Sequence, residues 1–120
     1  MRERAVDIKR VPARFYRTRA GNEPVREWLK GLASADRKVI GDDIRTVEFG
    51  WPIGMPVCRS LGKGLWEVRS SLPSNREARV LFCHRGGQLV LLHAFFKATR
   101  ATPSADLELA RDRMRDVMKA

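Results

Sequence analysis

The chain has 120 residues, a length typical of one domain, with a net charge of +10 and a pI near 10.8. A domain of this size buries roughly two-thirds of its unfolded surface, so it needs no cross-links to form a core. No apolar run approaches the ~20 residues that span a bilayer, and no apolar segment follows the charged N-terminus. We therefore expect neither a membrane helix nor a signal peptide.

The first expected element is a strand, "ARFYRT" at residues 13–18, in which apolar and polar side chains alternate. Two helices are expected to follow. Asn22 is placed to cap the first, Pro24 is tolerated in its first turn, and Ser34 can cap the second. Apolar residues recur at helical spacing in both segments and are expected to face the core: Val25, Trp28, Leu29 and Leu32 in the first, Ile40, Ile44 and Val47 in the second.

Three strands are expected over residues 64–72, 76–84 and 88–96, after a short strand or loop near residues 55–61. A Gly-Gly pair makes a tight turn between the last two strands. The strand over residues 88–96 is apolar on both faces, so we expect it to be central in the sheet.

A last helix is expected to start at Thr102 and Pro103. This order of elements predicts a small α+β domain, with helices packed on one face of a mostly antiparallel sheet. The cations would then lie on the other face or at one end. The domain is expected over residues 13–120, after a basic arm over residues 1–12. Apolar residues of the last helix share one side: Leu107, Ala110, Met114 and Val117.

Positive charge is concentrated in two parts of the sequence. Residues 1–20 carry a net +5 and residues 51–102 a net +6, whereas residues 21–50 carry −1 and residues 103–120 are neutral. The excess thus avoids the expected helices. This segregation indicates a face that binds a polyanion, the alternative being charge that serves solubility alone.

Several kinds of site are disfavoured. Cys58 and Cys83 are too few for a disulfide framework, and their apolar surroundings predict buried free thiols in a reducing, cytoplasmic compartment. The two histidines, His84 and His93, have no spaced ligand partners, so no metal site is expected. The sequence also lacks a complete phosphate-binding loop and a nucleophile elbow, and no cofactor is expected.

Arg79 stands out because it alternates in phase with apolar residues of its strand, and burying an unpaired charge is costly. It is either paired with Glu67 or Glu77, or available to a ligand. Arg69 lies either in a ligand site or on a solvated strand face, and Arg76 lies in a turn. The full set of cations on the adjoining strands and their ends is Arg59, Lys63, Arg69, Arg76, Arg79, Lys97 and Arg100.

Clustered arginine and lysine side chains bind phosphates and stabilise the charge that develops on a phosphoryl group during displacement. If the substrate is RNA, its own 2′-hydroxyl can be the nucleophile. A lysine among other cations has its ammonium form disfavoured and could act as a base. His93 is either a hydrogen-bonded core histidine or an acid–base group, and the same choice applies to His84. A metal-independent ribonuclease is therefore feasible.

Three segments resemble the HigB-like, phage-derived branch of the RelE/ParE toxin superfamily. They are "EPVREWLKGL" at 23–32, "GKGLWEVRSSL" at 62–72 and "RVLFCHRGGQLVLLHAFFKATRATP" at 79–103, followed by a charged helix. The resemblance covers roughly residues 13–118. Its most specific parts are the Gly-Leu-x-Glu-Val-Arg strand and the strand leading into Phe-x-Lys-x-Thr-x-x-Thr-Pro.

The resemblance implies a RelE-like fold and the toxin of a type II toxin–antitoxin pair. RelE-like members cleave mRNA, usually in the ribosomal A site, and a small antitoxin, often a helix-turn-helix DNA-binding protein, neutralises them. Arg69, Arg79 and Lys97 match the family's strand arginines and its first Phe-x-Lys lysine. The implied roles are that both arginines hold the scissile phosphate and Lys97 assists proton transfer or stabilises charge. Arg100 would bind a flanking phosphate. From the set of strand cations, Arg59, Lys63 and Arg76 are further expected RNA-binding residues.

The sequence departs from the family pattern at two positions. Phe82 stands where a tyrosine is usual, and Ala98 replaces the second lysine. The basic arm is outside the match and either grips rRNA or increases solubility. Two alternative functions stay open: a ParE-like toxin that inhibits DNA gyrase without cutting nucleic acid, and a degenerate toxin-fold protein that acts as a co-regulator with its antitoxin.

Overall fold

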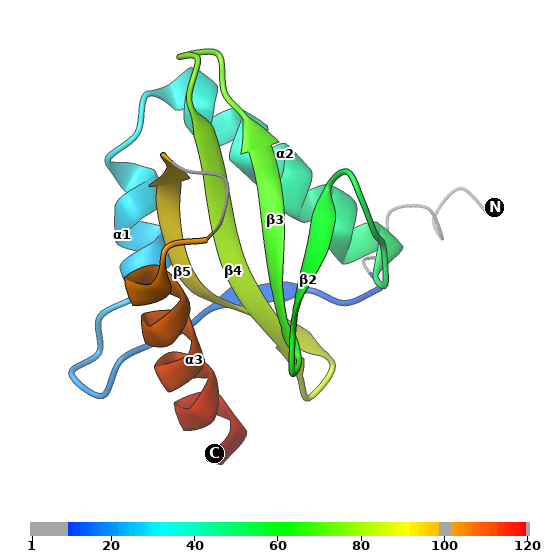
Figure 1. Ribbon diagram of the computed structural model, residues 1–120, viewed down its shortest axis with the longest axis vertical. Coiled ribbons are helices and arrows are strands. Elements are labelled where there is room, and N and C mark those ends of the chain that lie inside the picture. The colour runs from blue at the N-terminus through cyan, green and yellow to red at the C-terminus, as the bar shows by residue number, and fades with distance from the viewer. Residues whose placement is uncertain (1–9, 99–101, 120) are drawn as a thin grey trace, which may run out of the picture.

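The computed structural model describes residues 10–98 and 102–119, which form a twisted five-stranded sheet with three helices (Figure 1). The expected α+β class is confirmed. A strand also forms within the segment where the sequence left a strand or a loop open. The elements are β1 (Ala13–Phe15), α1 (Pro24–Lys30), α2 (Ser34–Gly50), β2 (Cys58–Gly62), β3 (Leu65–Ser71), β4 (Glu77–Arg85), β5 (Gln88–Lys97) and α3 (Ser104–Lys119).

The strands lie in the order β1-β5-β4-β3-β2. Only β1 and β5 are parallel, and the other neighbouring pairs are antiparallel. The apolar strand β5 is interior, as expected of a strand that is apolar on both faces, but β4 occupies the middle of the order. Both strands are buried along most of their length.

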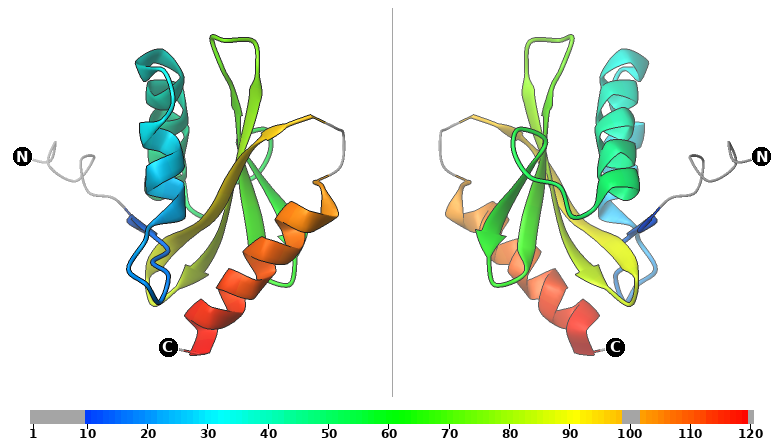
Figure 2. Two further views of the ribbon diagram at one scale, coloured as in Figure 1. Left: turned by 90° about the vertical axis from the view of Figure 1, so that its left-hand side faces the viewer. Right: turned by 90° about the vertical axis from the view of Figure 1, so that its right-hand side faces the viewer.

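The expectation that the helices share one face of the sheet is wrong, because α1 and α2 cover one face and α3 covers the other (Figure 2). On the first face, Val80 and Phe82 pack in the cluster that includes α2. On the second, Leu81 and Leu92 pack in the cluster that includes Met114 of α3. Strands that are apolar on both faces need cover on both sides.

The helices start one residue away from the expected caps. Glu23 is the N-cap of α1 and Ala33 that of α2, and neither makes a side-chain capping bond. Asn22 instead closes a turn with Thr18: its backbone N–H donates to Thr18 Oγ1 and its carbonyl accepts from the Thr18 N–H. None of the described helices is long and apolar enough to cross a membrane.

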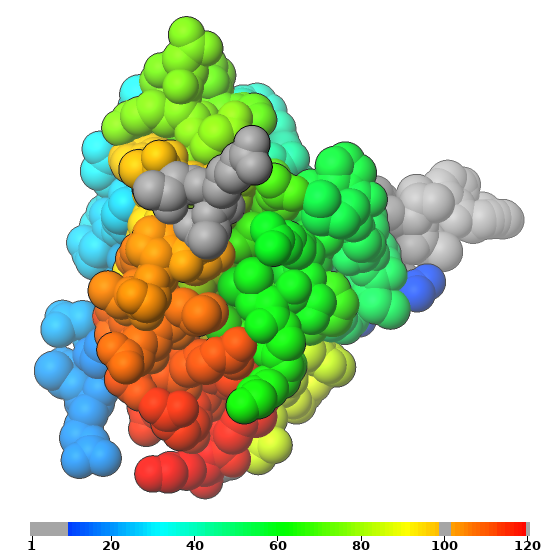
Figure 3. Space-filling view, in the orientation of Figure 1, coloured from blue at the N-terminus to red at the C-terminus, as the bar shows by residue number. Residues whose placement is uncertain are grey.

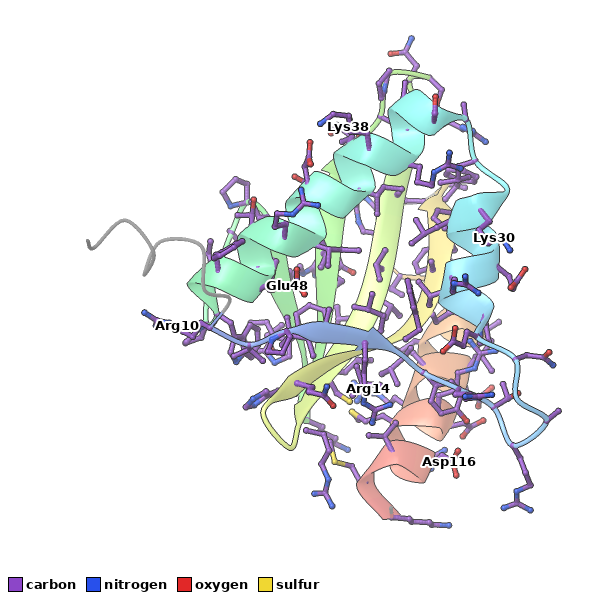
Figure 4. The ribbon with its side chains drawn as sticks, turned by 180° about the vertical axis from the view of Figure 1, so that it is seen from behind. Arg10, Arg14, Lys30, Lys38, Glu48 and Asp116 are labelled. Atoms are coloured by element: carbon purple, nitrogen blue, oxygen red, sulfur yellow. The ribbon has the colours of Figure 1, made fainter. Side chains whose placement is uncertain are left out.

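The chain packs onto the domain from residue 10 onward, within the segment expected as an arm. Val11 is buried, and its N–H and that of Arg10 both donate to the Glu48 carbonyl. The Glu48 side chain, on α2, accepts from the Ala13 N–H at 2.6 Å (Figure 4). Residues 1–9 of the expected arm lie outside the described residues.

Both cysteines are buried free thiols, as the sequence predicts. Burial raises the pKa of Cys58 to about 11, and the nearby Glu67 carboxylate adds to this rise. Burial likewise raises the pKa of Cys83 to about 11. Buried thiols that keep their proton are poor nucleophiles, so neither cysteine suits covalent catalysis at neutral pH.

Candidate functional site

Polar side chains gather on the α3-facing side of the sheet, at the end where β3 and β5 finish and β4 begins. Directly opposed residues on neighbouring strands point to the same face of a sheet. They form three rows, which we call the histidine row, the arginine row and the lysine row. The members are Arg59, Glu67, Leu81 and His93 in the first, Arg69, Arg79 and Phe95 in the second, and Ser71, Glu77 and Lys97 in the third.

The arginine row places two like charges side by side. Arg69 on β3 is the direct partner of Arg79 on β4. Glu67 holds the two together, since its Oε1 lies 3.8 Å from Arg69 Nε and 3.4 Å from Arg79 Nε. Glu67 and Arg79 are only 2% and 3% exposed. A buried charge must be paired, so removing either member would leave the other with only its longer contact, to Arg69 for Glu67 and to Glu77 for Arg79.

Arg79 makes further contacts with its guanidinium. Its Nη1 donates to the Ala78 carbonyl at 2.9 Å and lies 3.5 Å from Glu77 Oε1. Its buried Nε makes no hydrogen bond within the described part of the chain. Burial lowers the pKa of Arg79 and the facing Arg69 lowers it further, while Glu67 and Glu77 oppose the change. The ion pair considered from the sequence therefore exists, and it involves both carboxylates.

The lysine row is the more open edge of the site. The Glu77 carboxylate is 49% exposed, and Lys97 is half-buried. A hollow of about 290 Å³ adjoins this row and is lined by Pro56, Val57, Arg69, Ser71 and Glu77. Figure 3 shows this face of the molecule, with α3 in orange and red beside β2 and β3 in green.

The histidine row joins the sheet to α3. His93 Nε2 lies 2.6 Å from Asp106 Oδ1, in the first turn of α3. Thr102, just before the helix, donates from Oγ1 to Glu67 Oε2 at 3.2 Å. Sequence reasoning missed the Asp106 contact, because an acidic residue in a first helical turn is common for reasons of the helix dipole alone.

Arg76, expected among the RNA-binding residues, lies on the other face of the sheet. Its guanidinium carbon sits 3.8 Å from the centre of the Phe96 ring, and Nη2 lies 3.6 Å from Asp36 Oδ2. Phe96 packs with the cluster that contains α1 and α2 residues. These contacts explain Arg76 as a residue that anchors the β3–β4 turn.

The remaining candidate residues lie either near the three rows or at the other end of the sheet. Arg59 is exposed and lies in the histidine row. Lys63 lies in the β2–β3 turn and His84 near the end of β4, both at the opposite end of the sheet from the lysine row. Arg100 lies outside the described residues. The structure thus brings together Arg59, Arg69, Arg79, His93 and Lys97 from the expected set.

The departure at Phe82 leaves this cluster intact. The Phe82 ring is fully buried and packs edge-on against Trp51, with ring centres 5.5 Å apart, on the α2 side of the sheet. Arg79 points to the opposite face, in phase with Leu81. A tyrosine hydroxyl at position 82 would therefore lie away from the three rows.

The fold and the site thus define a small basic α+β domain with paired arginines at one end of its sheet. The family model described as "Phage derived protein Gp49-like (DUF891)" matches residues 27–115, and the chain belongs to that family. The Gp49-like family is a family of RelE/HigB-like toxins of toxin–antitoxin systems, which implies an antitoxin partner. A search of curated proteins finds no match to the chain.

Proposed function

We propose that the protein is an HigB-like endoribonuclease toxin that cleaves ribosome-bound mRNA by 2′-hydroxyl attack and so inhibits translation. The observation that carries this proposal is the arginine row, in which Arg69 and Arg79 face each other on neighbouring strands. Guanidinium groups offer planar pairs of N–H donors that match phosphate oxygens. Two opposed arginines can therefore hold one phosphodiester from two sides.

The chemistry of RNA cleavage suits such a site. The attacking 2′-hydroxyl comes from the substrate, so the protein must position the phosphate, move protons and stabilise the negative charge that develops on the phosphoryl oxygens. Arg69 and Arg79 would supply the stabilising donors. Lys97 would donate a proton to the leaving oxygen or stabilise its charge, and Arg59 would bind a flanking phosphate.

Phosphate access to Arg79 would come from the lysine row. The Glu77 carboxylate is half-exposed and pairs with Arg79 Nη1 at 3.5 Å, a loose contact. An incoming phosphate would replace this carboxylate as the acceptor for Arg79 Nη1. Glu67, which is buried, would stay in place and continue to bridge the two arginines.

The test is induced expression without antitoxin, followed by mapping of mRNA 5′ ends. Arg69→Ala is the informative variant, because Arg69 is 27% exposed and its loss leaves the buried Glu67–Arg79 pair intact. Arg45→Ala is the matched control, since Arg45 is an exposed arginine on α2 paired only through Asp42 in the described chain.

Wild type and Arg45→Ala should produce cuts at translated positions and arrest growth, and Arg69→Ala should do neither. Intact mRNA together with gyrase-dependent DNA damage would contradict the proposal and favour the ParE-like alternative. Co-expression of the neighbouring reading frame should suppress the cuts if it encodes the antitoxin, which we propose is a helix-turn-helix protein.

A further inference from the structure

Asp106 and His93 form a hydrogen-bonded acid–imidazole pair that borders the arginine row. His93 Nε2 lies 2.6 Å from Asp106 Oδ1, and both side chains are mostly buried. A carboxylate only accepts hydrogen bonds, so the imidazole donates from Nε2. This leaves Nδ1 of the neutral ring as a proton acceptor. We propose that His93 is the general base of the ribonuclease reaction and that Asp106 positions its ring, an inference that rests on the function proposed above.

The order of the rows supports this assignment. The arginine row lies between the histidine row and the lysine row, because Phe95 separates His93 from Lys97 on β5. Successive rows on one face are about 7 Å apart along a strand. A phosphate bound over Arg69 and Arg79 would thus have His93 on one side and Lys97 on the other. Displacement at phosphorus requires the attacking and leaving oxygens to lie on opposite sides.

The reaction balances with these groups. The 2′-oxygen forms a bond to phosphorus as His93 Nδ1 takes the 2′-hydroxyl proton, and the bond from phosphorus to the 5′-oxygen breaks. The leaving 5′-oxygen takes a proton from the Lys97 ammonium group. The products are a 2′,3′-cyclic phosphate and a 5′-hydroxyl. Solvent then removes the proton from His93 and returns one to Lys97.

If the His93–Asp106 pair had only a structural role, its loss would affect stability and not the cleavage rate of the folded protein. The same contact also ties the first turn of α3 to β5, so any variant that breaks it also loosens the helix. His93→Gln separates the two roles, because a glutamine amide nitrogen can still donate to Asp106 but its side chain cannot take a proton. Asp106→Asn keeps the shape and removes the charge, and Asp106→Glu keeps the charge.

The experiment measures single-turnover cleavage of mRNA on programmed ribosomes from pH 5 to 9, together with thermal unfolding of each full-length variant. The wild-type rate should rise with pH and then level off, because the imidazole must be neutral to accept a proton. The charged groups nearest His93 are Asp106 of α3 in direct contact, Arg59 of β2 and Glu67 of β3 in its own row, and Arg79 of β4 in the next row.

His93→Gln should lower the plateau rate by roughly 10²–10⁴-fold and abolish the rise with pH. Asp106→Asn should lower the rate by about 10²-fold, the usual cost of a misplaced catalytic group, and Asp106→Glu should restore part of it. Asp112→Asn, which changes an exposed acid on the same helix, should leave the rate unchanged.

Two outcomes would overturn the inference. If wild type cleaves and His93→Gln keeps its rate and pH profile, His93 is not the base. If His93→Gln and Asp106→Asn lower the unfolding temperature but leave the rate per folded molecule unchanged, the pair only holds α3. By contrast, a wild-type protein that cleaves no RNA under any condition would refute the proposed function itself.

Discussion

Arg79 belongs both to the buried ion pairs of the sheet and to the proposed phosphate site. Its guanidinium is nearly inaccessible, lies between the Glu67 and Glu77 carboxylates, and faces Arg69 across the strand pair. The two carboxylates offset the cost of placing two arginines together. The cluster is therefore held in one geometry by its own charges, which is what a phosphate site needs before its ligand arrives.

We predict that Arg79→Ala lowers the unfolding free energy by up to about 3–5 kcal/mol, because it leaves the buried Glu67 carboxylate with only its longer ionic contact to Arg69. Adding Glu67→Gln should recover part of that loss, since the amide carries no charge. Urea unfolding followed by circular dichroism measures both. Equal stability of wild type and Arg79→Ala would show that the pair contributes nothing. Toxicity tests should accordingly use Arg69→Ala, which spares the pair.

The two buried thiols should make folding stability depend on pH in the alkaline range. The ordinary thiol pKa of 9.0 applies to the unfolded chain, whereas the pKa of Cys58 and of Cys83 is raised to about 11 in the folded protein. Their contribution is fully present below pH 9, and about 2–3 kcal/mol per thiol is lost as pH rises to 11.

Urea titrations at pH 8, 9, 10 and 11 test this linkage. The double variant Cys58→Ala/Cys83→Ala should show a shallower fall in unfolding free energy than wild type between pH 9 and 11. Titration of other groups affects both proteins alike, so the difference in slope isolates the thiols. Parallel curves for the two proteins would refute the prediction.

At this scale the sequence predicted the arginines but not their partners in full. Arg79 could be singled out because it alternates in phase with apolar residues of its strand. Glu67 and Glu77 could be named as its ion-pair partners because they lie on the preceding and the same expected strand, respectively. Asp106 could not be predicted from the sequence, because its contact with His93 depends on where α3 crosses the sheet. The departure at Phe82 lies on the other face of the sheet, which depends on the strand register.

Among the elements, α3 is attached to the sheet by polar contacts around a narrow apolar strip. Ala110, Met114 and Val117 are its buried residues. Near its C-terminal end, Tyr16 donates from its hydroxyl to Asp116 Oδ2 at 2.7 Å. Arg113 Nη1 donates to the Leu92 carbonyl at 2.8 Å. With the His93–Asp106 contact in its first turn, the helix is thus tied to the rest of the domain near both of its ends.

We predict that Tyr16→Phe lowers the unfolding free energy by about 1.5–3 kcal/mol, the usual contribution of a hydrogen bond to a charged group. Amide hydrogen exchange near Asp116 should accelerate, while exchange in α2 should not change. Asp116→Ala should have a similar effect, since it removes the same bond from the other side. Unchanged exchange in both variants would mean that the bond does not anchor the helix.

Helical periodicity predicted all three helices, and alternation predicted the strands near residues 13–18 and 64–72, because each of these patterns reflects one buried face. The side on which α3 packs was not predicted. The apolar character of β5 on both faces indicated that both sides needed cover, yet periodicity cannot assign a helix to a side. The helix caps were missed because Asn22 makes turn contacts with Thr18 that compete with capping.

For the molecule as a whole, the separation of charge predicts how it meets RNA. Four cations, Arg59, Arg69, Arg79 and Lys97, lie on one face of the sheet, whereas residues 21–50, which form α1 and α2, carry a net charge of −1. RNA should therefore bind across the rows on the α3-facing side. For single-stranded RNA, each phosphate contact contributes about −0.7 to the slope of log K against log salt concentration.

Binding of a short single-stranded RNA, measured by fluorescence anisotropy, should weaken as salt rises, with a slope of log K against log salt near −3 for about four contacts. Arg59→Ala should make the slope shallower by roughly 0.7, and Arg45→Ala on the opposite side should leave it unchanged. A salt-independent affinity would contradict binding through this cationic face.

Cleavage of a single 2′-deoxy-substituted mRNA tests the central claim most directly. The substrate carries one deoxyribose at the scissile nucleotide and is compared with the all-ribose mRNA on programmed ribosomes in single-turnover experiments. The account predicts that the all-ribose mRNA yields a 2′,3′-cyclic phosphate and a 5′-hydroxyl, while the substituted position stays intact. Equal cleavage of both substrates, or a product without the cyclic phosphate, would contradict attack by the 2′-hydroxyl.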